Sequence, residues 1–337
     1  MDYTVAMQRA IALSENGLGK SAPNPIVGAV IIDATGNLIA EGFHNRMKSN
    51  DHAEIVAIKS AGKSAHGATM VVTLEPCDHI GSTTPCTQAI IDAGIATVVF
   101  AVSDPNPVAA GGAEKLRTSG VIVIADVLKE VAAHSNRAWL TKIKKNRPFF
   151  TWKVAATLDG KSAATDGSSK WISSEISRAD VQKLRRQSDA ILVGTNTVIT
   201  DNPKLIPRGD FVGYSHNPIR VICGERELPH DAAIFDGASE TVVVKSQDLD
   251  LLVEKLNELD INQVFVEAGP TLASAMVKHA LIDELVIYQA PSLLGSGKAF
   301  YARDFDSTIA DQMRLQHIST QVLDGDIKSV YRVRNGA

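Results

Sequence analysis

The sequence is poor in cysteine, poor in aromatic residues and lacks a long apolar run. Its three cysteines, Cys77, Cys86 and Cys223, are too few for a disulfide framework in a chain of 337 residues, and any pairing leaves one over. Metal binding or burial must therefore account for them. No run approaches the roughly 18 apolar residues of a membrane-spanning helix, and the first stretch, 1–16, mixes charged with apolar residues. We expect no membrane association and a cytoplasmic protein.

The sequence also lacks an excess of positive charge, since it has 34 Lys and Arg residues against 38 Asp and Glu residues. The formal net charge is -4 and aromatic residues make up 5% of the chain, so the sequence lacks the basic, aromatic surface that nucleic-acid binders use. We expect no nucleic-acid partner. The hydrophobic content of 45% and the charged content of 21% are those of an ordinary globular protein, and the length suits two domains rather than one.

The first half of the chain predicts an α/β domain. Apolar spacing predicts a helix over 3–15, and two β-rich runs, 26–32 and 38–40, flank the turn-forming segment 33–37. We expect these two runs to be adjacent antiparallel strands. The remainder alternates between the two element types, which indicates α/β layering, with helices over 52–62, 84–93 and 111–119 and strands over 69–74, 97–102 and 121–124.

A domain boundary is expected near residue 146. A helix predicted from about Val127 runs into the basic segment 141–148, which Pro148 ends, and we interpret the basic run as a solvated helix end. The two domains are therefore 1–145 and 148–337. The second half also alternates, with strands over 149–156, 189–193, 219–223, 241–244, 263–266 and 284–289 and helices over 174–187, 249–258 and 270–279. It repeats none of the motifs of the first half.

One constellation in the first half predicts a catalytic zinc site. His52 and the thiols of Cys77 and Cys86 supply one imidazole and two thiolates, which are donors that zinc prefers. Three protein ligands leave the fourth corner of a tetrahedron for water, which the metal acidifies. Glu54 follows His52 by two residues at the start of a predicted helix, where it can move a proton from that water to a leaving amine.

The order of these residues is that of zinc nucleobase deaminases. In that group a His-x-Glu motif precedes a Pro-Cys-x-x-Cys motif, whereas here eight residues separate Cys77 from Cys86. The intervening segment 78–85 is rich in turn formers and predicts a loop that shapes a substrate pocket. A lone histidine or cysteine would be an ordinary buried or surface residue, and Cys223, which lies in a predicted strand without such neighbours, is assigned to the core.

Residues 1–145 resemble the deaminase domain of bacterial RibD-type enzymes of riboflavin biosynthesis. The segments that carry the resemblance are 23–28, 52–54, 73–77 and 104–107. The resemblance implies a cytidine-deaminase-like three-layer fold and a pocket for a pyrimidine ribotide. The side chains that it places in this pocket are those of Asn24, His44, His79, Asp104 and Asn106.

The second half resembles the reductase domain of the same family, over about 148–335. The segments concerned are 153–161, 169–172, 201–203, 266–272 and 290–295. The resemblance implies a dihydrofolate-reductase-like α/β domain that binds NADPH. The residues that it implies for NADPH are Ala155, Trp171, Thr197, Asp201, Gly269, Pro270, Thr271, Leu272, Ala273, Ser274 and Ala275. The residues that it implies for the substrate are Ser169, Arg185, Leu205, Arg208 and Glu267.

Residue chemistry supports parts of this assignment. The segment 267–271 joins a predicted strand to a predicted helix, so free backbone N–H groups there can hold a cofactor phosphate. Arg185 and Arg208 can clamp the ribose phosphate because guanidinium groups match phosphate oxygens, although Arg185 taken alone would be part of a solvated helix face. Trp171 taken alone would be a core residue.

The sequence departs from the family in two places. Ser82 stands where the family usually has a lysine or arginine, which removes a basic contact near the deaminase substrate, and His79 or a residue outside the loop is left to replace it. After the predicted strand 219–223 the chain reads Gly224-Glu225, where the family often has an aspartate, so cofactor contacts near Gly224 are not carried over.

The sequence therefore predicts a bifunctional enzyme that uses Zn²⁺ and NADPH. The first domain would hydrolytically deaminate the diaminopyrimidinone ribotide, and the second would reduce the ribose of the resulting aminouracil ribotide to a ribityl group, with Lys153 or Glu267 as candidates to assist proton transfer. Two alternatives stay open at this point. One is a deaminase with a non-catalytic second domain, and the other is a nucleic-acid editing deaminase. The resemblance also implies a homo-oligomer.

Overall fold

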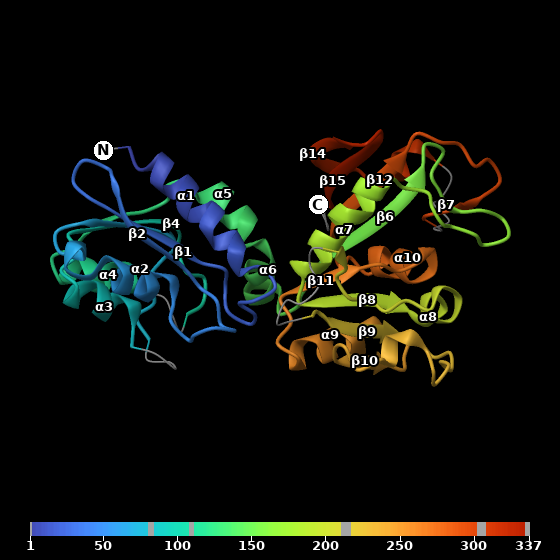
Figure 1. Cartoon of the computed structure of the whole chain (residues 1–337), viewed down its shortest axis with the longest axis horizontal. Coiled ribbons are helices and arrows are strands. Elements are labelled where there is room, and N and C mark those ends of the chain that lie inside the picture. The colour runs from blue at the N-terminus through green and yellow to red at the C-terminus, as the bar shows by residue number, and fades with distance from the viewer. Residues whose placement is uncertain (1, 80–83, 108–110, 210–216, 302–307, 334–337) are drawn as a thin grey trace. The chain divides into compact units, whose positions relative to one another are not determined.

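The computed structural model describes residues 2–79, 84–107, 111–209, 217–301 and 308–333. The chain divides into two units, Met1–Asn146 and Arg147–Ala337, each with its own core. Figure 1 shows an α/β arrangement in both. We describe each unit separately.

Unit 1 contains, within its described residues, a five-stranded sheet in the order β2-β1-β3-β4-β5. β1 pairs antiparallel with β2 and with β3, whereas β3, β4 and β5 are parallel to one another. The predicted antiparallel pair is therefore confirmed, and the second strand runs three residues beyond its predicted end. The strands are β1 (Gly28–Ile32), β2 (Leu38–Phe43), β3 (Thr69–Leu74), β4 (Thr97–Val102) and β5 (Ile122–Ile124).

Helices cover both faces of this sheet, and two glycines show how closely the helices approach the strands. A Cβ atom on Gly28 would lie 2.1 Å from the backbone oxygen of Ala10 in α1, and one on Gly42 would lie 2.5 Å from that of Ala53 in α2. Gly42 pairs with Ala29, the neighbour of Gly28. Because neighbouring strand residues point to opposite faces, α1 and α2 lie on opposite sides of the sheet. The helices are α1 (Thr4–Ser14), α2 (Ala53–Ala61), α3 (Cys86–Asp92) and α4 (Gly112–Thr118).

The helix predicted from Val127 is two helices, α5 (Lys129–Ser135) and α6 (Arg137–Lys145). The break falls at Asn136, which is buried and whose backbone leaves the helical region at φ -95° and ψ 17°. Its side-chain oxygen accepts a hydrogen bond from the backbone N–H of Ile26, at 3.3 Å. Asparagine side chains compete in this way for backbone groups, and here the contact ties α6 to the segment before β1.

Unit 2 contains, in the part that the structure describes, an eight-stranded sheet in the order β10-β9-β8-β11-β6-β12-β15-β14. The six strands from β10 to β12 are mutually parallel, and β15 and β14 complete the sheet in antiparallel pairing. All six predicted strands are confirmed. They are β6 (Phe149–Thr157), β8 (Ala190–Gly194), β9 (Ile219–Cys223), β10 (Thr241–Val244), β11 (Gln263–Val266) and β12 (Ile282–Ala290).

Several elements of unit 2 were not predicted. The hairpin of β14 (Leu315–Leu323) and β15 (Asp326–Val333) is among them, as are the short strands β7 (Lys161–Ala163) and β13 (Lys298–Ala299) and the helix α8 (Thr195–Asp201). β14 forms the edge of the sheet and is exposed on both sides over most of its length. An edge strand with little buried surface lacks the apolar alternation by which strands are recognised.

Apolar residues pack on both faces of the second sheet. On one face α9 (Leu249–Glu258) and α10 (Pro270–Lys278) cover alternate residues of β6, and on the other α7 (Glu175–Arg186) covers β8 and β12. Cys223 is buried in the first of these cores, as predicted. Because parallel strands end at the same edge, the segments that follow β6, β8 and β11 converge there, which is where α/β sheets bind ligands.

The search for membrane-spanning helices covered the described residues, and none of their helices is both long and apolar enough to cross a bilayer.

Candidate active sites

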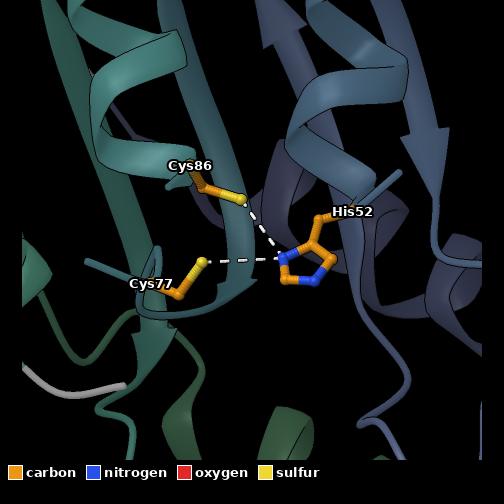
Figure 2. A group of neighbouring side chains, drawn as sticks. All are labelled: His52, Cys77 and Cys86. Carbon is orange, nitrogen blue, oxygen red and sulfur yellow. Dashed lines mark hydrogen bonds between the residues drawn. The ribbon is translucent and has the colours of Figure 1, made fainter. Parts of the chain in front are cut away.

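Three side chains of unit 1 form a group that can hold a metal ion. His52 immediately precedes α2, Cys77 follows β3 and Cys86 is the first residue of α3, and their ligand atoms lie within 4.8 Å of one another. His52 Nδ1 lies 3.6 Å from the Cys77 Sγ and 3.3 Å from the Cys86 Sγ (Figure 2). Tetrahedral zinc with its usual bond lengths separates nitrogen and sulfur ligands by roughly 3.6 Å. The donor set and its spacing therefore fit zinc.

Local hydrogen bonds hold the two cysteines together across their loop. The backbone N–H of Thr87 donates to the Cys77 carbonyl at 3.2 Å, and the Thr87 hydroxyl donates to Asp78 Oδ1 at 2.6 Å. These contacts fasten the turn after β3 to the first turn of α3. Ser82, where a basic family residue is missing, lies outside the described residues.

The electrostatics of the group favour a thiolate at Cys77 and a neutral thiol at Cys86. The hydrogen bond from Cys86, supported by His52, lowers the pKa of the Cys77 thiol to about 4. A hydrogen bond with Cys77 raises the pKa of His52 to about 9. A hydrogen bond with Cys77 is also the largest cause that raises the pKa of Cys86, and burial is the second. A thiolate is the form in which cysteine binds a metal, so Cys77 is the member of the group that is favoured in its ligand form.

Glu54 lies beside this group in the first turn of α2. Its side chain is buried, and burial raises the pKa of its carboxyl group. A general acid/base works best when its pKa approaches the working pH, so the shift suits a group that takes up and releases a proton. Glu54 lines a pocket of about 250 Å³ together with His52 and Cys77.

The pocket brings together all five substrate residues expected from the resemblance, namely Asn24, His44, His79, Asp104 and Asn106. His44 Nδ1 lies 2.9 Å from the carbonyl of Asp51, so this nitrogen carries the proton. Nε2 is then the acceptor for the side-chain amide of Asn24 at 3.2 Å, and burial lowers the pKa of the ring, which keeps it neutral. Asp104 Oδ1 accepts the backbone N–H of Asn106 at 2.8 Å, which fixes their relative position.

Three further pocket residues were not singled out from the sequence. Glu75 accepts hydrogen bonds from the backbone N–H groups of Asp104, at 3.2 Å, and Ala113, at 2.9 Å, so it links the Asp104 turn to α4. Trp139 and Ile143 line the pocket from α6. The sequence indicated α6 only as a helix end, and nothing in its pattern tells which sheet face it covers.

The site residues expected in unit 2 lie around the carboxyl edge of the sheet. Gly269 follows β11 and precedes α10, whose first helical residue is Pro270, and a Cβ atom on Gly269 would meet open space. The first-turn N–H groups of α10 have no intrahelical partner and no side-chain cap, which makes this end suitable for an anion. Thr271 is exposed, whereas Ala273 and Ser274 are buried in the core, so within the expected cofactor segment the exposed surface lies at its start.

The other residues expected to contact NADPH or substrate differ in exposure. Trp171 is 67% exposed, so the alternative that it is a core residue is wrong, and the Arg178 guanidinium lies 4.4 Å from its ring centroid. Ala155 lies on β6 and Thr197 on α8, both half-buried. Exposed side chains are found at Ser169, Asp201 and Arg208.

Arg185 and Glu267 form a buried, two-pronged ion pair. Arg185 Nε lies 2.5 Å from Glu267 Oε1, and Arg185 Nη2 lies 2.8 Å from Glu267 Oε2. Arg185 is 7% exposed, so the alternative of a solvated helix face is wrong. Burial alone would raise the pKa of Glu267, but the charges of Arg185, Lys153 and Arg208 outweigh it and the pKa is lowered. Burial lowers the pKa of Lys153.

This cluster therefore gathers three cationic groups around one carboxylate. Arg185, Lys153 and Arg208 leave an excess of positive charge beside Glu267, and such an excess attracts an anionic ligand. Leu205, expected to contact the substrate, is 3% exposed and packs in the core beneath this region. Leu205 therefore presents little side-chain surface to a ligand.

Comparison with known families defines the class of the protein. The model of the cytidine and deoxycytidylate deaminase zinc-binding region matches residues 2–102, and the model of the RibD C-terminal domain matches residues 148–329. Together with the fold and the metal-type site, these matches define a two-domain α/β enzyme that joins a deaminase to a reductase.

Individual relatives match almost the whole chain. The riboflavin biosynthesis protein RibD of Mycobacterium tuberculosis (strain ATCC 25618 / H37Rv) is 41% identical over 96% of this chain and 95% of its own length, and that of Escherichia coli (strain K12) is 37% identical over 86% and 88%. The solved structure of Acinetobacter baumannii RibD, form 1, has a TM-score of 0.91 at 37% identity over 98% of both chains. The chain belongs to the RibD family of bifunctional deaminase/reductases of riboflavin biosynthesis.

A relative from Thermotoga maritima agrees with this assignment. A structure from Thermotoga maritima, titled a diaminohydroxyphosphoribosylaminopyrimidine deaminase/5-amino-6-(5-phosphoribosylamino)uracil reductase, has a TM-score of 0.90 at 35% identity and covers 98% of this chain and 99% of its own. The fold class expected from the sequence, a cytidine-deaminase-like domain followed by an α/β reductase domain, is confirmed.

Proposed function

We propose that the two units catalyse consecutive reactions on one pyrimidine ribotide. Unit 1 deaminates 2,5-diamino-6-(5-phosphoribosylamino)pyrimidin-4(3H)-one, and unit 2 reduces the ribosyl group of the product, 5-amino-6-(5-phosphoribosylamino)uracil, with NADPH. The observation that carries the proposal is the group of His52, Cys77 and Cys86, of which His52 and Cys77 line one pocket together with buried Glu54. The substrates are those named for the Thermotoga maritima relative.

In unit 1, His52, Cys77 and Cys86 would hold the zinc ion. Zinc bound there would supply a Lewis acid that makes a water molecule acidic near neutral pH. Glu54 accepts the proton of that water and delivers it to the departing amine, so the pyrimidine amine is exchanged for a carbonyl and ammonia leaves. Asn24, the neutral His44 and Asp104 line the same pocket and orient the base by hydrogen bonds.

In unit 2, the residues from Gly269 to Ala275 with Ala155, Trp171, Thr197 and Asp201 would bind NADPH. NADPH bound there would supply the hydride that reduces C1 of the ribosylamino group. Arg208 and Arg185 attract the ribose phosphate, while Glu267 holds Arg185 in place by its two hydrogen bonds. Lys153, whose pKa burial lowers, is the group of this cluster best suited to donate the proton that completes the reduction.

The test is a coupled assay on purified, zinc-loaded protein with the diaminopyrimidinone ribotide, following ammonia release and NADPH oxidation in one cuvette. The proposal expects one NADPH oxidised for each ammonia released. Ammonia without NADPH oxidation would identify a deaminase with a non-catalytic second domain. The absence of both signals with zinc bound would refute the substrate assignment. A nucleic-acid substrate is disfavoured by the family and by the net charge of -4.

Two further expectations stay predictions. A homo-oligomer is expected from the family, and the mass of the particle in solution tests it. A cytoplasmic location is expected from the sequence, and fractionation of cells tests it.

A further inference from the structure

Arg220 is a fully buried arginine of unit 2 that lies outside both candidate sites. It is the second residue of β9, and none of its side chain reaches solvent. Burying a guanidinium costs several kcal/mol of desolvation, and an apolar side chain of similar size is often at least as stabilising. Its Nε has no hydrogen-bond partner among the described residues. Core packing alone therefore does not explain Arg220.

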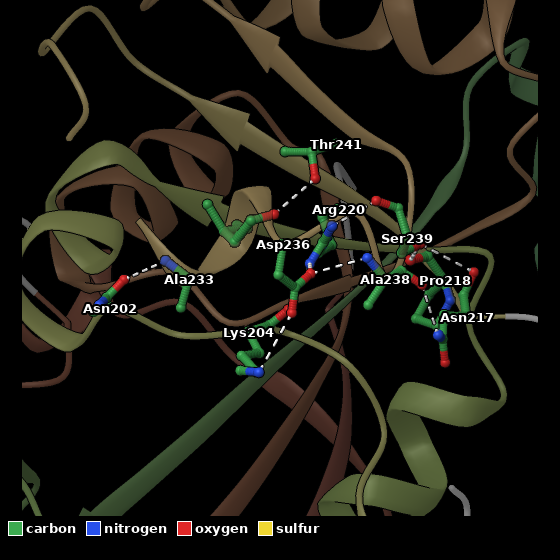
Figure 3. Close-up of polar contacts among 11 residues, drawn as sticks. Asn202, Lys204, Asn217, Pro218, Arg220, Ala233, Asp236, Ala238, Ser239 and Thr241 are labelled. Atoms are coloured by element: carbon green, nitrogen blue, oxygen red, sulfur yellow. Dashed lines mark hydrogen bonds and ion pairs between the residues drawn. The ribbon is translucent and has the colours of Figure 1, made fainter. Parts of the chain in front are cut away.

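The guanidinium joins three separate segments of the chain (Figure 3). Nη1 donates to the backbone carbonyl of Lys204 at 3.2 Å and to Asp236 Oδ1 at 2.8 Å. Nη2 donates to the backbone carbonyl of Ser239 at 2.5 Å. Arg220 thus fastens β9 to the segment after α8 and to the segment before β10.

Neighbouring contacts strengthen the same connection. Asn202, which ends α8 at a positive φ of 43°, accepts the backbone N–H of Ala233 on its Oδ1 at 2.7 Å. Lys204 Nζ lies 3.6 Å from Asp236 Oδ2, and Asp236 Oδ1 also accepts the backbone N–H of Ala238 at 3.0 Å. We call residues 202–208 the 202–208 loop. Its first half is held by the 233–239 segment through Arg220 and Asn202.

The second half of the 202–208 loop is held by α7. The backbone N–H of Arg208 donates to Gln182 Oε1 at 3.1 Å, and Arg185 Nη1 lies 3.5 Å from the carbonyl of Ile206. Between the two supports, Leu205 is buried with a positive φ of 50°. The loop carries the exposed Arg208, whose charge acts on Glu267. The backbone conformation of the loop therefore determines the position of the Arg208 guanidinium.

We propose that Arg220 is a positioning residue of the reductase site, which fixes the 202–208 loop so that Arg208 meets the phosphate of the ribotide. This inference rests on the proposed function of unit 2. Arg220 acts through backbone carbonyls and touches no reactant. Its effect should therefore be on binding of the phosphate-bearing substrate rather than on hydride transfer or on NADPH.

The test compares Arg220→Met and Arg220→Lys with the wild type in steady-state reduction of the aminouracil ribotide. For Arg220→Met we expect the KM for the ribotide to rise about tenfold, as for one lost charge-assisted contact. The kcat and the KM for NADPH should stay within about twofold, because a uniformly lost binding contact changes KM alone. Arg220→Lys, which keeps the charge and one donor direction, should lie between.

Ribose 5-phosphate used as a competitive inhibitor gives a second readout. Its inhibition constant should rise in parallel with the KM for the ribotide, whereas a general loss of unit 2 structure would lower kcat and weaken NADPH as well. Ammonia release by unit 1 serves as the internal control in every variant. Lys245→Met, which removes an exposed lysine 3.5 Å from Glu227 on the same unit, is the matched surface control and should leave all constants unchanged.

A milder variant covers the case in which Arg220→Met does not fold. Asn202→Gly keeps a residue that tolerates a positive φ and removes only the acceptor for Ala233, so it should raise the KM for the ribotide a few-fold. The inference is overturned if folded variants keep the KM for the ribotide within twofold, or if the KM for NADPH rises equally. A wild type without reductase activity would instead refute the proposed function.

Discussion

The two units solve the same task, holding a ribotide at a reactive group, with different kinds of side chain. In unit 1 the candidate reactive residues lie at the ends of helices and strands, and their imidazole, thiol and carboxyl groups indicate a particular chemistry. In unit 2 the polar groups of the site pair over long sequence distances, as Arg185 and Glu267 do across 82 residues. Arginine and glutamate also form ion pairs in many proteins without a catalytic role, so these residue types do not indicate a particular chemistry.

The difference follows from where the chemistry resides. A metal must be bound by protein atoms of a particular kind, so a deaminase carries its reaction in its own sequence. A nicotinamide cofactor brings the hydride with it, and the protein supplies binding and orientation, which many residue types perform. Unit 1 should therefore respond to substitution of single side chains through chemistry, and unit 2 mainly through binding and stability.

The largest expected effect is loss of the metal from unit 1. Cys86→Ala removes one of three ligands, so we expect zinc content to fall from one per chain to near zero and ammonia release to fall to background. Reduction of the aminouracil ribotide should remain at the wild-type rate. Metal analysis and the two assays on the same preparation check this, and loss of both activities would break the comparison between independent units.

Next in size is the effect of Glu54→Gln. The amide keeps the shape of the side chain but cannot carry a proton from water to the amine, so deamination should fall by about 10²–10⁴-fold. Zinc content should stay at the wild-type value, which separates this variant from a ligand variant. Ammonia release with a parallel metal determination is the measurement, and near-normal turnover would contradict the role of Glu54.

A third prediction concerns stability in unit 2. Arg185→Met leaves Glu267 buried without its partner, and breaking a buried pair in this way costs about 3–5 kcal/mol. Replacing both residues, as Arg185→Met with Glu267→Leu, should recover much of that loss in stability. Urea unfolding of the single and double variants checks this. A cost below about 1 kcal/mol for the single variant would show that the pair is not buried in solution.

The smallest expected effect concerns two exposed turn carboxylates, one in each unit. Hydrogen bonds from Thr35 and Asn37 lower the pKa of Asp33 to about 2, and a hydrogen bond from Thr157 with the backbone of Leu294 and Gly295 lowers that of Asp159 to about 2. A depressed carboxyl pKa stabilises the fold above the unfolded value of 3.8 and ceases to do so as pH falls towards 2.

Asp33→Asn and Asp159→Asn should therefore lower the melting temperature slightly at pH 7, and the difference from wild type should shrink as the pH falls from about 4 towards 2. Melting curves across this range are the measurement. A difference that grows on acidification would contradict the sign. The shift at Asp159 should be the larger, because it joins segments 135 residues apart whereas Asp33 bonds within one turn.

Much of unit 1 could be predicted because its signals are local. Short stretches of sequence were enough to recognise the periodicity of its strands and helices, the antiparallel pair of β1 and β2, and the residues of the metal-binding type. Glu75 could not be assigned a role, because its partners, the backbone groups of Asp104 and Ala113, are 29 and 38 residues away. The break at Asn136 depends on a contact with Ile26 across 110 residues.

Unit 2 shows where local reasoning stops. Its apolar strands were predictable, but the exposed β14 lacks the alternation that identifies a strand. The ion pair of Arg185 was invisible in a helix rich in cations, because only the sheet topology brings Glu267 against α7. Trp171 shows the opposite case. A large apolar side chain taken alone is expected in the core, but Trp171 is 67% exposed.

The central claim is that one chain holds two independent sites acting in a fixed order. It is tested most directly by NADPH oxidation in the Glu54→Gln variant with each ribotide supplied separately. The account predicts oxidation at the wild-type rate with the aminouracil ribotide and almost none with the diaminopyrimidinone ribotide. Equal oxidation of both would contradict the order, and oxidation of neither by a zinc-loaded, folded variant would contradict the independence of the two sites.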